Sequence, residues 1–358
     1  MIVIGADPHK SEHTAAAICR ATGELRRSET VAARSAGHAA LLDWARALDP
    51  ERVWAIEDCR HVSGALERFL VERSERVVRV PPKLMGESRR AQRTAGKSDA
   101  IDAVAVARAA LREGLDALPA ATVDEAALEI KLLVDHRDDL VSERTRIQSR
   151  LRWHLHELWP ALEIPPAALD RAKWLDKVAG RLGRAEQSAR VRVCRDELRR
   201  VRELTRAASA LERELGQLVA AKAPALLELA GCGPLSAARI IAECGDARRF
   251  DSDAKLARLA GVAPIPASSG NRQRHRLHRG GNRKLNCAIH RIAVTQGRMH
   301  DPARDYLARK QAEGKTRLEA LRCLKRQLVR RVWHLVRAPM THFPSTAPIS
   351  ASSGVGLT

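Results

Sequence analysis

The sequence predicts an α/β domain with a mixed sheet, followed by two largely helical regions. Short apolar and β-branched runs alternate with helical apolar spacing at the start of the 358-residue chain. Residues 124–220 form a charged stretch with leucine at helical spacing and little glycine. The C-terminal region, from Ala223 on, begins with two apolar segments joined by a tight glycine turn. Alternating strands and helices are typical of α/β domains, whereas unbroken helical spacing is typical of bundles and hairpins.

The first region is expected to contain five strands and three helices. The runs MIVIGAD, HTAAAIC and RSETVAA have the character of strands, and RATGE between the last two is typical of a turn. Ser35 can cap a helix, and Pro81 and Pro82 end the last strand. The expected order is strands at 1–7, 13–19 and 27–33, a helix at 35–48, a strand at 52–58, a helix at 61–73, a strand at 76–80, a basic loop at 83–97 and a helix from Ser98.

The middle and C-terminal regions are expected to be helical. Residues 123–158 and 187–220 have the apolar spacing of two long helices, which would pair as a coiled coil or as an antiparallel hairpin. Residues 223–246 predict helix, glycine turn and helix, 250–300 a loop-rich basic segment, and 315–337 a helix. The tail beyond has no Lys, Arg, Asp or Glu and is expected to be disordered. The expected domains are 1–120, 121–222, 223–337 and the tail 338–358.

The charge balance predicts a polyanionic partner. Lys and Arg total 63 against 43 Asp and Glu, which gives a net charge of +20, and nucleic acid is the first candidate for such a chain. Aromatic residues make up only 3% of the chain, which disfavours single-strand binding by base stacking. The seven cysteines form no CxxC pair, and no apolar run reaches the roughly 18 residues of a membrane span. We therefore expect reduced thiols, no membrane partner and a cytoplasmic protein.

Four carboxylates occupy positions that a metal site would use. Asp7 ends the first expected strand and Glu57 the fourth, and Asp99 and Asp102 lie three apart at the start of a helix, on one face. Sites in open α/β sheets gather beyond the strand ends, and clustered carboxylates usually hold hard cations such as Mg²⁺ or Mn²⁺. Two such ions stabilise the attacking and leaving oxygens of phosphoryl transfer. Asp58 competes with Glu57, because neighbours in a strand face opposite sides.

The C-terminal region contains two patterns that suit phosphate. LAGCGPLSAARIIAE (229–243) predicts a helix-hairpin-helix, in which Gly231 and Gly233 allow a tight turn before a helix whose free amides meet a backbone phosphate. The alternative is a helical hairpin that only packs. Ser268 and Ser269 lie in a loop that leads into basic residues, and guanidinium groups bind phosphate in a bidentate way. The candidate nucleic-acid-binding residues are Gly231, Gly233, Arg272, Arg274, Arg276, Arg279, Arg283 and Lys284.

A zinc site in the same segment is disfavoured. His275, His278, Cys287 and His290 have the spacing H-x2-H-x8-C-x2-H, but the spacer is shorter than that of a zinc finger and arginines crowd it. Phosphate contact and helix packing are the preferred roles of these residues.

Three motifs together resemble a known family. IGADPHK, AIEDC and GKSDAIDAVAVARA resemble the Asp-Glu-Asp-Asp domain of the IS110 family of insertion-sequence transposases, and the strand order resembles the ribonuclease H fold of Holliday-junction resolvases. The resemblance extends over about residues 2–335. It implies that the catalytic, metal-binding tetrad falls on Asp7, Glu57, Asp99 and Asp102.

The same resemblance implies a serine nucleophile and further partners. The family pattern G-x-x-P … S-G matches best when Ser269, directly before Gly270, is the nucleophile, and the adjacent Ser268 stays open. The implied product is a phosphoserine-linked DNA end that another strand attacks. The resemblance also implies double-stranded DNA as substrate, a structured non-coding guide RNA from the same element, and a dimer that pairs into a tetramer, with the long helices as the dimer element.

Three functions compete on the sequence alone. A Mg²⁺-dependent DNA transposase or recombinase, acting through the tetrad and Ser269, is the leading hypothesis. A metal-dependent endonuclease of the junction-resolvase type, without covalent serine catalysis, is second, and a non-enzymatic nucleic-acid-binding protein is third. A tyrosine recombinase is disfavoured, because Tyr306 is the one tyrosine and lies in a helical stretch without a recognisable Arg-His constellation.

Overall fold

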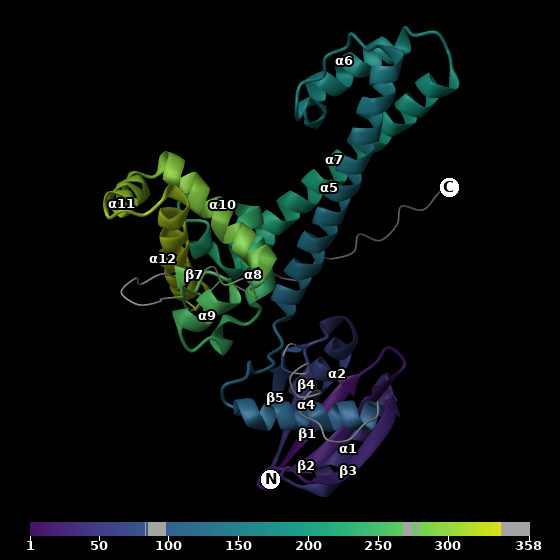
Figure 1. The fold of residues 1–358 in the computed structure, drawn as a ribbon. Helices are drawn as coiled ribbons and strands as arrows, with labels where there is room; N and C mark the ends of the chain where they lie inside the picture. The colour runs from purple at the N-terminus through teal and green to yellow at the C-terminus, as the bar shows by residue number, and fades with distance from the viewer. Residues whose placement is uncertain (83, 85–97, 268–274, 277, 279, 338–358) are drawn as a thin grey trace, which may run out of the picture. The chain divides into compact units, whose positions relative to one another are not determined.

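The chain folds into two compact units, Met1–Asp124 and Glu125–Thr358 (Figure 1). The computed structural model describes residues 1–82, 84, 98–267, 275–276, 278 and 280–337. Nearly all of the predicted basic loop and the whole predicted tail, 338–358, lie outside these residues. Among the helices in the described ranges, none combines the length and the apolar character that crossing a membrane requires.

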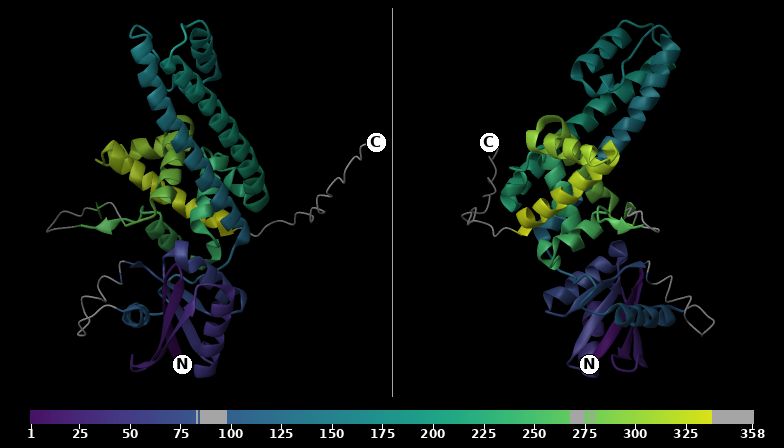
Figure 2. Two further views of the ribbon diagram at one scale, coloured as in Figure 1. Left: turned by 90° about the vertical axis from the view of Figure 1, so that its right-hand side faces the viewer. Right: turned by 60° about the vertical axis from the view of Figure 1, so that its left-hand side comes forward.

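The first unit is built on a five-stranded mixed sheet in the order β3-β2-β1-β4-β5. β1, β4 and β5 are parallel, whereas β2 runs antiparallel to both β1 and β3. One side of the sheet packs against α1 and α2 and the other against α4, as the left view of Figure 2 shows. The predicted fold class is confirmed, with elements β1 Ile2–Pro8, β2 Glu12–Cys19, β3 Leu25–Ala32, α1 Ser35–Leu48, β4 Arg52–Glu57, α2 Arg60–Glu72, β5 Val77–Val80 and α4 Asp99–Glu113.

A close approach of α4 to β1 fixes the geometry of the sheet's second side. Gly5 lies in the middle of β1, and a Cβ built on it would come 2.1 Å from the Ala103 carbonyl oxygen and 2.5 Å from the Ala107 amide nitrogen. The α4 residues that face the sheet are mostly alanine and valine, so little side-chain volume separates helix and strand. The start of α4 is therefore held close to the C-terminal end of β1.

The second unit begins with a long antiparallel hairpin of α5, Glu125–Leu158, and α7, Ala189–Lys222 (Figure 1). Ion pairs join the two helices in antiparallel register: Arg137 to Glu212, Arg200 to Glu143 and Arg150 to Glu197. Of the two predicted pairings, the structure contains the hairpin within one chain. A further helix, α6 Ala172–Gly183, packs on the end of the hairpin through a separate apolar cluster.

The rest of the second unit is one helical core. Its elements are α8 Pro234–Cys244, α9 Asp253–Leu259, the short strands β6 Ile265–Pro266 and β7 His275–Arg276, α10 Arg283–Met299, α11 Asp301–Ala312 and α12 Arg317–Arg337.

Two local expectations for this region are wrong. The segment before the glycine turn forms only a 3-10 turn at Pro224–Leu226, because Pro224 starts a new turn directly after α7 and Gly231 follows too soon for a longer helix. Residues 283–299, expected to be loop-rich, form a regular helix whose buried face includes Leu285, Ile289 and Ile292.

Replacing Gly5 with alanine is expected to destabilise the protein. The added methyl group collides with backbone atoms of α4 that cannot move aside alone, so we expect a loss of about 3 kcal/mol in the free energy of unfolding. Urea unfolding of the full chain measures the change. The control is Gly64→Ala in α2, where the nearest atom is the flexible end of Arg68 and the better helix propensity predicts no loss. Equal stabilities of both variants and wild type would contradict the close packing.

Candidate active site

The ends of β1 and β4 bring two of the predicted carboxylates together. The strands are parallel and Ala6 pairs with Ile56, so Asp7 and Glu57 follow at the same edge of the sheet. Val53 and Ala55 of β4 pack against α4, and alternation places Glu57 on that face as well. Val3 and Gly5 give Asp7 the same orientation. Both side chains therefore belong to the α4 side of the sheet.

Asp58 belongs to the opposite side. Its amide still donates to the Val80 carbonyl oxygen, at 3.0 Å, so the strand alternation continues through it. The negative charge of Asp58 helps to raise the pKa of Arg79, and Arg79 is ion-paired with Glu67 of α2. The register thus separates the two candidates: Glu57 lies on the α4 side, and Asp58 lies on the side of α1 and α2.

The other two carboxylates come from the first turn of α4. Ser98 caps this helix, with its hydroxyl oxygen accepting from the Ile101 amide at 3.3 Å. Asp102 is buried, with 7% of its surface exposed, and Asp99 is partly exposed. The cap therefore sets where the helix starts and, with it, where both aspartates stand.

The pKa of Asp7 is raised by its burial and by nearby acidic side chains. It is 6% exposed, and burial raises its pKa above the ordinary value. The charge of His9 lowers it, and the charges of Asp102 and Asp99 raise it further. Partial burial raises the pKa of the half-buried Cys59 thiol, and the charges of Glu57, Asp58 and Asp7 raise it further. The charges of Asp99 and Asp102 therefore act on Asp7, and those of Glu57, Asp58 and Asp7 act on Cys59.

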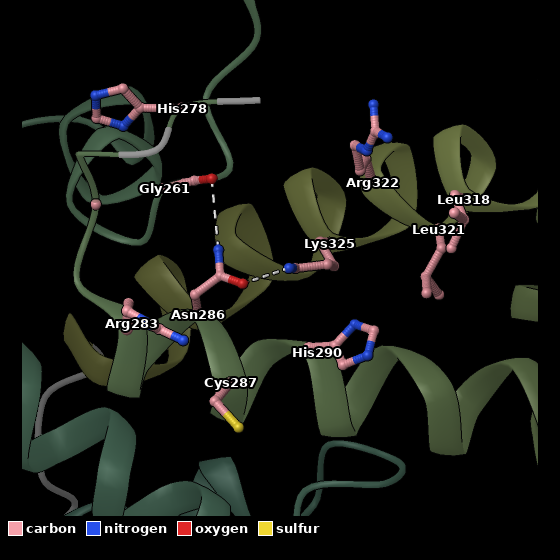
Figure 3. Close-up of a pocket in the computed structure, with 11 residues that line it drawn as sticks. Gly261, His278, Arg283, Asn286, Cys287, His290, Leu318, Leu321, Arg322 and Lys325 are labelled. Atoms are coloured by element: carbon pink, nitrogen blue, oxygen red, sulfur yellow. Dashed lines mark hydrogen bonds between the residues drawn. The ribbon is translucent and has the colours of Figure 1, made fainter. Parts of the chain in front are cut away.

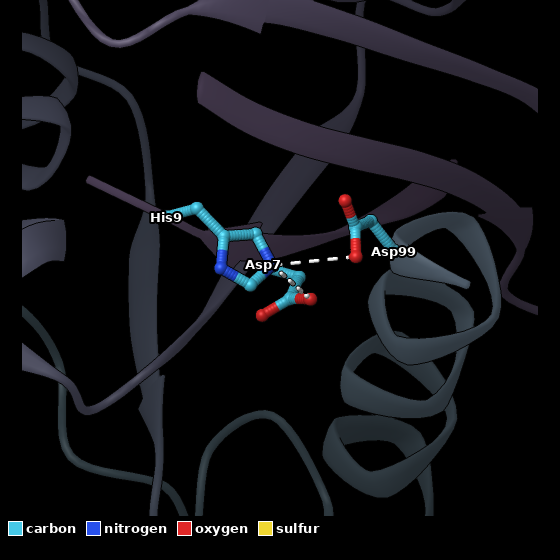
Figure 4. Close-up of side chains that lie close together, drawn as sticks. All are labelled: Asp7, His9 and Asp99. Carbon is cyan, nitrogen blue, oxygen red and sulfur yellow. Dashed lines mark ion pairs between the residues drawn. The ribbon is translucent and has the colours of Figure 1, made fainter. Parts of the chain in front are cut away.

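His9 was missed by the sequence reasoning. Its Nε2 atom lies 3.2 Å from the Asp7 carboxylate and 3.4 Å from that of Asp99, so the ring bridges them (Figure 4). These three residues offer ligand atoms within 4.8 Å of one another, an arrangement that can hold a metal ion. The available signal was the spacing in ADPHK, which puts His9 two residues after Asp7, on the same side of an extended chain.

The predicted phosphate-contacting residues lie in the second unit. Gly231 has a positive φ of 78°, as the predicted tight turn requires, and Gly233 caps α8. Arg276 is exposed on β7, and Arg283 starts α10. Lys284 is ion-paired with Asp135 of α5 at 2.7 Å. Ser268, Ser269, Arg272, Arg274 and Arg279 lie outside the described residues.

Fold and site together define a class of protein. A mixed sheet of ribonuclease H type with carboxylates at the ends of its central parallel strands is the framework of metal-dependent phosphoryl-transfer enzymes. Residues 4–160 match the family model of DEDD transposases of the IS110 type, described as "Transposase". Residues 223–308 match the family model described as "Transposase IS116/IS110/IS902 family".

Curated relatives span nearly the whole chain. It is 30% identical to an insertion element IS116 uncharacterized 44.8 kDa protein of Streptomyces clavuligerus, over 94% of this chain and 94% of that protein. It is 27% identical to an insertion element IS900 uncharacterized 42 kDa protein of Mycobacterium paratuberculosis, over 84% and 86%. The chain belongs to the IS110/IS116/IS900 family of insertion-sequence transposases, which are DNA phosphoryl-transfer enzymes.

Among solved structures, the chain is similar to T. thermophilus RuvC in complex with Holliday junction substrate. The similarity has 15% identity and a TM-score of 0.27, and it covers 34% of this chain and 99% of that one. The two family models and the relative from Streptomyces clavuligerus confirm the family resemblance drawn from the three motifs.

Neutralising Asp7 is expected to stabilise the metal-free protein. Because the pKa of Asp7 is raised above 3.8 in the folded state, its ionisation favours unfolding as the pH rises through that value. Asp7→Asn should therefore raise the free energy of unfolding at pH 7 by about 0.5–2 kcal/mol, the usual range of single stabilising changes. Below pH 3.8 the gain disappears, because Asp7 is then protonated in both states.

Thermal unfolding in a chelator at pH 7 and pH 3.5 measures this difference. Asp43→Asn, an exposed change on α1, is the matched control and should alter stability by less than about 0.5 kcal/mol. A loss of stability at pH 7 in Asp7→Asn would show that Asp7 has favourable partners that outweigh burial and repulsion.

Proposed function

We propose that the protein is a DNA recombinase that cuts and rejoins strands at an insertion sequence, using Mg²⁺ or Mn²⁺ held by Asp7, Glu57, Asp99 and Asp102. The observation that carries the proposal is the crowding of acids around Asp7, a buried carboxylate that two further aspartates destabilise. A fold does not keep such repulsion without an offsetting role. A divalent cation would offset it directly.

The donor set fits such an ion. Carboxylate oxygens are the preferred ligands of Mg²⁺ and Mn²⁺. The acids come from the ends of two adjacent strands and the start of a helix, elements that the sheet and the close α4 packing hold in fixed positions. When bound, the ions would activate the attacking oxygen and neutralise charge on the leaving one. The protein's own part is to position the four oxygens and to hold His9 beside them.

Ser269 is the proposed nucleophile, and the adjacent Ser268 is the alternative. Its hydroxyl oxygen would form a bond to the scissile phosphorus as the bond to the 3′ oxygen breaks, and the hydroxyl proton would pass to that leaving oxygen. A 3′ hydroxyl from another strand would reverse the step and restore the serine. One phosphodiester bond replaces another in each step, so rejoining needs no external energy source. The family membership and the S-G position before an arginine-rich stretch support this assignment.

The arginines after the serines would grip the scissile phosphate. Arg276 and Arg283 flank this stretch from β7 and α10. Lys284 is better assigned to holding α10 on α5, because Asp135 already neutralises it. Gly231 and Gly233 would let the start of α8 approach duplex DNA.

Two further partners belong to the same proposal. A structured guide RNA is consistent with the net charge of +20, because Lys and Arg side chains neutralise backbone phosphates. A dimer that pairs into a tetramer is supported by exposed apolar side chains on the hairpin: Trp153 of α5 and Val193 of α7 stand at the same level of the antiparallel pair, between the contacts Arg150–Glu197 and Arg190–Glu157.

Glu57 and Asp58 are distinguished by a paired substitution. Glu57→Gln removes a proposed metal ligand and should lower the rate of Mg²⁺-dependent cleavage of DNA carrying the element's ends by at least about 100-fold. Asp58→Asn lies on the other side of the sheet and should change the rate only a few-fold. The rates are measured with the guide RNA present and well below the melting temperature of either variant. The reverse order of effects would assign the site to Asp58.

The serine step is tested by trapping protein on DNA. Wild type should yield a covalent adduct that survives denaturing electrophoresis, and Ser269→Ala should yield none, whereas Ser268→Ala retains it. Asp102→Ala should lose both adduct and cleavage, because the metal site then fails. Free cut ends that persist in Ser269→Ala would instead support the second candidate function, a metal-dependent endonuclease of the junction-resolvase type.

A further inference from the structure

A basic pocket lies between α10 and α12 in the second unit (Figure 3). Its volume is about 660 Å³, within the usual range of ligand sites. Arg283 and His290 of α10 and Arg322 and Lys325 of α12 line it. Among the described residues, no acidic side chain lines it. The described lining residues are Gly261, His278, Gly281, Arg283, Asn286, Cys287, His290, Leu318, Leu321, Arg322 and Lys325.

Lys325 is the unusual member of this lining. It is only 7% exposed, and its ammonium donates to the Asn286 side-chain oxygen at 2.6 Å. Among the described residues no carboxylate lies within ion-pair distance of it. Burial, together with the nearby charge of Arg322, lowers its pKa. A buried ammonium without a counter-ion is costly, and one neutral hydrogen bond offsets only part of that cost.

Two other cations of this unit, one buried and one half-buried, are paired with carboxylates. Arg239 of α8 is paired with Asp135, Asp138 and Glu243. Arg326, the next residue after Lys325, is paired with Asp253 at 2.8 Å. The fold therefore supplies carboxylates to Arg239 and Arg326. At Lys325 it leaves the charge directed into a pocket that Arg283 and Arg322 also enter.

Hydrogen bonds connect the pocket to Ala260 and Gly261, which directly precede the segment 262–280; this serine segment contains Ser269. Asn286 accepts from Lys325 and donates to the Ala260 carbonyl oxygen at 2.7 Å and to that of Gly261 at 3.4 Å. Gly261 and Gly281 are packed so tightly that a Cβ on Gly281 would come 2.3 Å from the Gly261 Cα atom. These two glycines close the segment 262–280, which contains Ser269. One hydrogen-bonded chain thus runs from the pocket to the point where that segment begins.

We propose that this pocket binds a phosphate of a nucleic-acid backbone, neutralised by Lys325, Arg322 and Arg283. The inference deepens the proposed function and rests on it for the presence of nucleic acid. A single phosphate fills only part of the volume, and Leu318 and Leu321 give the adjoining sugar an apolar wall. Through Asn286 the bound phosphate fixes the strand relative to the base of the serine segment. Lys325 is accordingly a nucleic-acid anchor outside the carboxylate site.

The test is the salt dependence of binding by the full chain. Fluorescence anisotropy is recorded with a labelled DNA duplex and, separately, with a labelled RNA hairpin of the element, from 0.05 to 0.3 M salt. Loss of one phosphate contact lowers the slope of log K against log salt by about 0.9 for a duplex, which is about 8-fold in affinity at 0.1 M. Lys325→Met and Arg322→Gln should each show this loss with the nucleic acid that occupies the pocket, DNA or RNA.

The control removes a charge from the opposite face of the same helix. Arg331 lies nine residues after Arg322 on α12, which is half a turn away, and is exposed. Arg331→Gln should leave both slopes unchanged. If Lys325→Met lowers the melting temperature, the binding slopes of Arg322→Gln and Arg331→Gln are compared instead. Arg322 is exposed, so its replacement should not disturb the packing of the core.

A second readout uses a thiol in the pocket. Cys287 is exposed and lines the pocket, so the bound nucleic acid should slow its alkylation several-fold in wild type and not in Arg322→Gln. A slope reduced with DNA alone assigns the phosphate to DNA, and one reduced with RNA alone assigns it to RNA. The phosphate-binding role of the pocket would be overturned if Lys325→Met and Arg322→Gln kept the wild-type slopes with both DNA and RNA and if neither nucleic acid protected Cys287 in wild type. These results would leave the proposed function standing if the covalent DNA adduct still formed.

Discussion

The close approach of α4 to β1 is the constraint on which the site depends. Because Gly5 has no side chain and alanines face it, the helix start lies near the strand end, and Asp102 comes under the influence of Asp7. Burial and repulsion there cost stability, which the well-packed apolar clusters on both sides of the sheet offset. The same packing that places the acids also prevents them from moving apart.

The second unit has its own organising contact, at Asp135 of α5. This carboxylate accepts from Arg239 of α8 at 2.5 Å and Lys284 of α10 at 2.7 Å, and these cations hold its pKa well below the ordinary range. Asn282 adds a bond to the buried Glu243 and caps α10. The long hairpin is thereby tied to the helix that follows the serine segment, which gives that segment a fixed base.

Strand order, helix positions in the first unit and the places of the four acids at the strand ends and the helix start could be predicted from sequence, because alternation, caps and strand ends are local signals. Their role as metal ligands stays a prediction. Which side of the sheet Glu57 and Asp58 each occupy could be determined only from the register of β4 with β1 and β5. The helix at 283–299 was missed because Arg, Asn and His obscured the apolar spacing of Leu285, Ile289 and Ile292. Lys325 gave no signal at all, since a lysine in an arginine-rich helix is usually solvated and only tertiary packing buries it.

In the proposed function, Asp7, Glu57, Asp99 and Asp102 together hold a divalent metal ion. A crystal structure of the full chain grown with Mn²⁺, with anomalous scattering recorded, tests this claim most directly. The account predicts an anomalous peak bound by Asp7 and Asp102 oxygens, with Glu57 or Asp99 completing the set, at roughly 2.0–2.2 Å. Crystals of Asp7→Asn grown in the same way should show no anomalous peak at this position. Saturating Mn²⁺ with no peak at these oxygens, or with peaks only on unrelated surface acids, would contradict the account.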